Sequence, residues 1–94
     1  MGVLVILELD GPTDALLAAA ADLEARRPTP VVSARMIAPT ETGVVVATFW
    51  ESAAGRDDYQ SHPEHGEALR ASGLLDAVTE MRSRAFEDAD LTLH

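Results

Sequence analysis

The sequence lacks cysteine and lysine, and its aromatic residues are only two phenylalanines, one tyrosine and one tryptophan. The absence of cysteine excludes disulfide bonds, thiolate metal sites and cysteine nucleophiles, and it favours a cytoplasmic location. The chain has seven arginines and sixteen acidic residues, which gives a net charge of -9. Because a polyanion is bound by clustered cations, we expect no nucleic-acid partner.

Long apolar runs and repeated glycines are also missing. No segment approaches the roughly 20 apolar residues that a membrane span needs, so we expect no membrane partner. The apolar segment 3–7 has no basic region before it and is followed by Glu8 and Asp10, which favours a strand over a signal peptide. Asp10-Gly11-Pro12 is a single turn and lacks the glycines of a phosphate-binding loop.

The length of 94 residues and the apolar content of 47% predict a single domain over residues 1–94 with a modest core. Continuous or alternating apolar residues predict strands at 2–9, 31–37, 43–50 and 77–86, with a short strand at 91–93 after a polar break at 87–90.

Helical spacing and end signals predict three helical segments. The first, 14–27, has Thr13 as its expected N-cap and an apolar stripe at helical spacing, formed by Leu16, Leu17, Ala20, Leu23 and Arg27. Ser52 is expected to cap 53–61, Pro63 to begin 63–72 after a bend, and Gly73 to end it.

The resulting order β-α-β-β-α-β predicts a ferredoxin-like α+β fold, with a four-stranded antiparallel sheet and the helices on one face. The other face is a difficulty, because the two alternating residue sets of strand 43–50 are both apolar. Val44, Val46 and Trp50 form one set, and Val45, Ala47 and Phe49 form the other. An apolar face without helices would remain exposed, so we expect a homodimer that pairs through the sheet faces.

The segment around Trp50 carries the most chemical information. The strand ends on Trp50, and the helical segments that follow contain Tyr59, His62 and His65. These four side chains combine aromatic surface with groups that titrate near neutral pH. We therefore expect any chemical or binding site to lie here.

The same residues carry a family resemblance. Phe49-Trp50-Glu51-Ser52, the later Tyr59 and Pro63, and the element order together resemble the dimeric α/β-barrel superfamily and, within it, the antibiotic-biosynthesis-monooxygenase group. The resemblance implies a dimer whose two sheets pack together, with a cavity between the sheet and helices of each subunit. Members of the group include cofactor-independent oxygenases of polyketide aromatics, haem-degrading oxygenases, isomerases and proteins without known activity.

The haem-degrading branch has a characteristic asparagine, tryptophan and histidine. Here the first strand has no asparagine, Tyr59 stands at the tryptophan position, and Ala68 stands at the ligand position, with His65 one turn earlier. The spacing of His62 and His65 also lacks the further ligands of a metal site. We therefore expect neither metal nor cofactor.

Each candidate residue has a structural and a functional interpretation. His62 is either a general base or a helix-entry residue whose ring caps a backbone N–H. Tyr59 either packs on the sheet or orients a substrate oxygen. Arg35 either lies at an open sheet edge or pairs with Glu8 or Glu80 across strands, or it holds an anionic substrate group. Trp50 is a core residue, a pocket wall or both. Phe49 and His65 are expected to contribute to the ligand surface.

Two functions remain open. The first is a cofactor-independent monooxygenase that acts on a small planar aromatic or polyketide-type molecule, with His62 as the base, and with Tyr59 and Arg35 holding substrate oxygens. The alternative is a non-catalytic dimer that binds a small apolar or aromatic ligand or serves as an accessory module.

Overall fold

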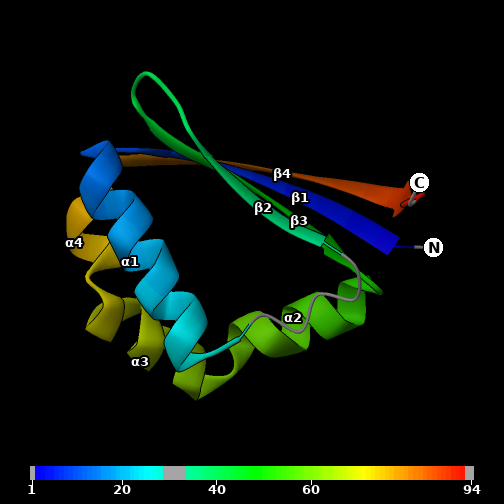
Figure 1. Cartoon of the computed structure of the whole chain (residues 1–94). Coiled ribbons are helices and arrows are strands. Elements are labelled where there is room, and N and C mark those ends of the chain that lie inside the picture. The colour runs from blue at the N-terminus through cyan, green and yellow to red at the C-terminus, as the bar shows by residue number, and fades with distance from the viewer. Residues whose placement is uncertain (1, 29–33, 93–94) are drawn as a thin grey trace.

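The computed structural model describes residues 2–28 and 34–92, and in these ranges four antiparallel strands form one sheet in the order β2-β3-β1-β4. The helices lie on one face of this sheet (Figure 1). The elements are β1 (Gly2–Asp10), α1 (Thr13–Arg26), β2 (Ala34–Pro39), β3 (Gly43–Trp50), α2 (Ala53–Ser61), α3 (Pro63–Ser72), α4 (Leu74–Ala77) and β4 (Glu80–Ala89). The ferredoxin-like α+β fold expected from the sequence is confirmed.

The core lies between the helices and the two central strands. Residues directly opposite each other on antiparallel strands share a face, so the pairs Leu9–Val44 and Val3–Trp50 lie on the same side of the sheet. Leu16 of α1 is fully buried against Leu9 and Val44, whereas Trp50 and Val3 belong to a second buried cluster. Burial of each large aliphatic side chain stabilises the fold by about 1.5–3 kcal/mol.

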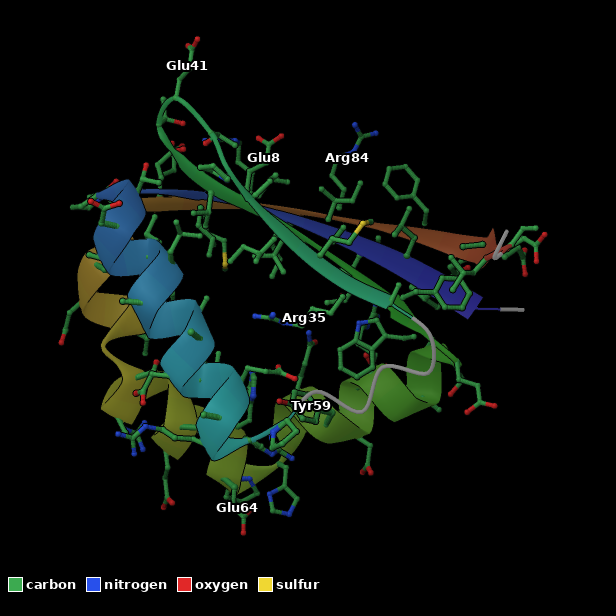
Figure 2. The ribbon with its side chains drawn as sticks, viewed as in Figure 1. Glu8, Arg35, Glu41, Tyr59, Glu64 and Arg84 are labelled. Atoms are coloured by element: carbon green, nitrogen blue, oxygen red, sulfur yellow. The ribbon has the colours of Figure 1, made fainter. Side chains whose placement is uncertain are left out.

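The opposite face of the sheet is called the open face below. Much of it is apolar, and no helix formed by residues 2–28 and 34–92 lies over it (Figure 1). Figure 2 shows Glu8 and Arg84 projecting from this side, away from the helices. The pairings place further apolar residues on this face, which are Leu4, Ile6, Ala34, Met36, Ala38, Val45, Ala47, Phe49 and Phe86. Asp10, Glu80 and Arg82 lie on the same face, near its hairpin end. The alternation in β3 therefore predicted two apolar faces correctly.

The last strand differs from the prediction at both ends. Instead of a strand at 77–86, the short helix α4 is followed by β4 at Glu80–Ala89. Gly73 has a φ of 81°, and its carbonyl accepts from Ala77 N at 3.1 Å, so the chain begins a new helical turn after α3. Leu74, Ala77 and Val78 then pack on the core, which a strand at 77–79 would not allow.

Beyond the predicted end, β4 continues because its pairing with β1 extends to Gly2 opposite Ala89, after a register shift. Residues 87–89 of the expected polar break thus belong to the strand. The predicted short strand at 91–93 is absent at residues 91–92, and Leu93 lies outside the described residues.

The remaining boundaries agree closely with the sequence. Ser52 caps α2 by accepting a hydrogen bond from Gly55 N at 3.0 Å, Pro63 opens α3, and Gly73 ends it, all as predicted. The N-cap of α1 is Pro12 instead of Thr13, because the Thr13 hydroxyl donates to Gly43 O at 3.1 Å. Residues 31–33 of the predicted second strand lie outside the described residues.

Candidate functional site

Trp50, the last residue of β3, is a core residue with 5% of its surface exposed. It packs against Val3 and Val5, and its indole N–H donates to Thr48 Oγ1 at 2.9 Å. The indole donor is therefore already paired, and Trp50 offers only its ring. The interpretation of Trp50 as a core residue is therefore confirmed.

Tyr59 of α2 joins Trp50 to His65 of α3. Its ring centroid lies 5.4 Å from Trp50 with a 50° tilt, and 5.0 Å from His65 with a 57° tilt. Tilted arrangements at these distances are favourable for aromatic rings. We call Trp50, Tyr59 and His65 the aromatic row.

Arg27, which follows α1, covers the Tyr59 ring with its guanidinium carbon 4.0 Å from the centroid. Its Nη1 donates to Tyr59 O at 2.8 Å, and the Tyr59 hydroxyl donates to Arg27 O at 3.0 Å. Arg27 was not among the candidate residues. The signal was its place on the apolar stripe of the first helix, a position at which a charged residue must have a partner.

His65 is half-buried, and its Nδ1 is buried without a hydrogen-bond partner within residues 2–28 and 34–92. Burial lowers the pKa of His65 below its ordinary value, and the positive charge of Arg27 lowers it further. A lowered pKa favours the neutral imidazole, in which one of the two ring nitrogens carries a lone pair.

His62 has a different environment. Its side chain is exposed at the bend between α2 and α3, and its Nδ1 accepts from Glu64 N at 3.2 Å, which caps α3. The histidine ring in contact with Tyr59 is that of His65. The argument that favoured His62 by its proximity to Tyr59 is therefore wrong, because the bend at Pro63 turns the next helix back toward Tyr59.

Arg35 lies on the helix side of the sheet, opposite Thr48. Figure 2 shows it between the sheet and the helices, on the same side of the sheet as Tyr59. Arg35 stands in the edge strand β2, so the expected place at an open sheet edge is confirmed. Its Nε lies 3.4 Å from a carboxylate oxygen of Glu24 in α1, so the alternative pairing with Glu8 or Glu80 is wrong.

The carboxylates of Glu8 and Glu80 instead lie beside Arg82, which also pairs with Asp10. Arg82 and Thr42 hold the pKa of the Asp10 carboxyl below its usual value through hydrogen bonds. This exposed cluster stands at the hairpin end of the open face, so it contributes no group to the aromatic row.

Phe49 lies on the open face, whereas Trp50 lies on the helix side. Alternation along β3 separates these neighbours, so the expectation that they contribute to one ligand surface is wrong. Phe49 instead lines a hollow of about 140 Å³ together with Leu4, Ala34, Met36, Ala47, Thr48, Ala89, Asp90 and Leu91. This hollow is mostly apolar.

A second hollow, of about 460 Å³, lies between the end of α1 and α3, and its lining includes Arg26, Arg27, Glu64 and Glu67.

In the part of the chain that the structure describes, no group of three or more histidine, aspartate or glutamate side chains is placed to hold a metal ion. No helix within residues 2–28 and 34–92 has the length and apolar character needed to cross a membrane.

Comparison with known proteins bears on the fold. No protein-family model matches the chain, and no curated protein is significantly similar to it. Rv0793 from Mycobacterium tuberculosis superposes with a TM-score of 0.68 at 20% identity, over 99% of this chain and 100% of that one. A dimeric ferredoxin-like protein of unknown function from Jannaschia sp. CCS1 has a TM-score of 0.68 at 16% identity, over 93% and 99% of the two chains.

SnoaB, a cofactor-independent oxygenase from Streptomyces nogalater, has a TM-score of 0.62 at 16% identity, over 98% of this chain and 94% of that one. At these identities the similarity shows the fold alone. The resemblance to dimeric ferredoxin-like proteins, an oxygenase among them, is thus confirmed at the level of the fold.

Proposed function

We propose that this protein is a homodimer that binds a small, planar, acidic aromatic molecule on the helix side of its sheet and oxidises it without a cofactor. The observation that carries the proposal is the aromatic row, which ends in a neutral, half-buried imidazole with an unpaired Nδ1. The fold shared with the oxygenase SnoaB supports the class of reaction but does not assign it.

In this proposal His65 is the general base and accepts a proton from an activated carbon or a phenol. Arg35 holds the resulting anion, and the Tyr59 oxygen accepts a hydrogen bond from a substrate hydroxyl, because its own proton is donated to Arg27 O. Trp50 packs against Tyr59 and joins the aromatic row to the buried core. For an activated CH₂ group, the carbanion adds O₂ to form a peroxide anion, which takes back the proton held by His65 to give a hydroperoxide. Loss of water from the hydroperoxide leaves a C=O group.

The open face supports the homodimer. No helix in the described part of the chain covers it, and it exposes Met36 and Phe86 among other apolar residues. Association through this face would remove these side chains from water, which is favourable in proportion to the apolar area buried. The neighbours from Jannaschia, Thermobifida fusca and Bacteroides fragilis are themselves dimeric.

Trp50 is the only tryptophan, so its fluorescence reports directly on the proposed site. The test is to titrate the protein with 1,8-dihydroxyanthrone, a planar acidic aromatic with an activated CH₂ group, and to measure O₂ uptake above the rate without protein. His65→Phe keeps an aromatic ring but removes the base. His62→Asn is the matched control, because asparagine also caps helices.

We expect quenching of Trp50 by the ligand in all three proteins, and loss of O₂ uptake only in His65→Phe. Loss of O₂ uptake in His62→Asn alone would indicate that His62 is the base. Binding without O₂ uptake in the unsubstituted protein would leave the non-catalytic ligand-binding or accessory dimer. Absence of both signals at saturating ligand would refute the proposed site.

A further inference from the structure

Arg27 and Tyr59 are linked in both directions although they lie 32 residues apart. The guanidinium donates to the backbone of Tyr59, the phenol donates to the backbone of Arg27, and the guanidinium stacks on the phenol ring. A single hydrogen bond would leave either side chain free to rotate. This three-part contact fixes the ring plane of Tyr59 relative to the end of α1.

The other cations near the end of α1 have carboxylate partners. Arg26 pairs with Asp22 at 2.8 Å, and Arg35 pairs with Glu24 at 3.4 Å. No carboxylate within residues 2–28 and 34–92 lies within ion-pairing distance of Arg27. Among the described residues its charge thus has no carboxylate partner, and its guanidinium lies against the Tyr59 ring of the aromatic row.

The effect reaches His65 by two routes. Tyr59, held by Arg27, contacts the imidazole at 5.0 Å, so the orientation of one ring determines the packing of the other. Burial is the main cause of the lowered pKa of His65, and the positive charge of Arg27 lowers this pKa further. Tyr59 is the titratable side chain from α2 in contact with His65. A nearby positive charge disfavours the imidazolium form and preserves the neutral base.

We infer that Arg27 is a positioning residue of the proposed site, which fixes the ring of Tyr59 against the imidazole of His65 and adds its positive charge to this part of the site. Arg27 acts through these two residues and contacts no reacting atom. The role in catalysis rests on the proposed function, but the effect on His65 is a property of the ligand-free protein and is measured without substrate.

The test is an NMR titration of the His65 imidazole, assigned by the loss of its signal in His65→Phe. Arg27→Met keeps the side-chain stem but removes the charge and the donors, and Arg27→Lys keeps the charge but loses the planar stacking group. Arg26→Met is the matched control, because it removes a neighbouring cation whose partner is Asp22.

We expect an upward shift in the pKa of His65 in Arg27→Met, a smaller shift in Arg27→Lys, and none in Arg26→Met. A purely structural Arg27 would reduce thermal stability in Arg27→Met without moving this pKa, and that result would overturn the inference. If Arg27→Met does not fold, the same comparison is made with Arg27→Lys, where an unchanged pKa together with unchanged Tyr59 ring signals would overturn it.

If the proposed function is wrong, the protein will not oxidise the anthrone, but the NMR titration of His65 can still be carried out on the ligand-free protein. The two ideas therefore fail separately. If O₂ uptake is observed, the pH at which its rate is half-maximal should shift upward in Arg27→Met, in the same direction as the pKa of His65.

Discussion

Replacing Met36 by glutamate tests whether the open face is the dimer interface. Met36 is 64% exposed in the single chain and lies opposite Ala47 on this face, in the edge strand β2. Complete burial of a methionine side chain is worth about 1.5–3 kcal/mol, so covering the exposed part contributes about 1–2 kcal/mol per chain. A twofold interface contains the residue twice, which gives about 2–4 kcal/mol.

A glutamate at this position loses that contribution and also requires burial of an unpaired charge. Since about 1.4 kcal/mol corresponds to a tenfold change, the dissociation constant of the dimer should rise by about 100-fold or more. The chain offers a closely matched control in Met81, which is 60% exposed but lies on the helix side of the sheet, opposite Leu9. Met81→Glu should leave the dimer intact.

The measurement is sedimentation velocity over a range of protein concentrations for the unsubstituted protein and both variants. We expect dimers for the unsubstituted protein and Met81→Glu, and monomers for Met36→Glu at concentrations where the others are dimeric. Equal dissociation constants for all three would refute the open-face interface. Dissociation caused by Met81→Glu alone would place the interface on the helix side of β4.

Two further predictions concern stability. Leu16→Ala should lower the free energy of unfolding by about 3 kcal/mol in urea titration, because Leu16 is fully buried, whereas Leu75→Ala at an exposed position of α4 should change it by about 0.5 kcal/mol or less. Because the pKa of folded His65 is lowered, the unfolded chain binds more protons below pH about 6.5. The free energy of unfolding should therefore fall as the pH decreases through this range. A His65→Phe variant whose free energy of unfolding falls equally steeply with pH would contradict this.

Local signals determined much of the fold. Ser52, Pro63 and Gly73 act within one helical turn of their own position, so their roles follow from residue type and spacing. The two alternating apolar sets of β3 showed that both sheet faces are apolar. The end of β4 depended on its partner β1, and the turn of α4 depended on the core beneath it, neither of which is encoded in the local residue pattern.

The candidate site shows the same division. The sequence alone determined that Trp50, Tyr59 and a histidine would lie near each other, because a strand end and the following helices deliver them within a short segment. Only the tertiary structure decided which histidine contacts Tyr59 and that Arg27 covers its ring, since both depend on how α1, α2 and α3 pack. Spacing along the chain fixes which face of an element a side chain occupies, but contacts between elements depend on the angles and distances at which those elements meet.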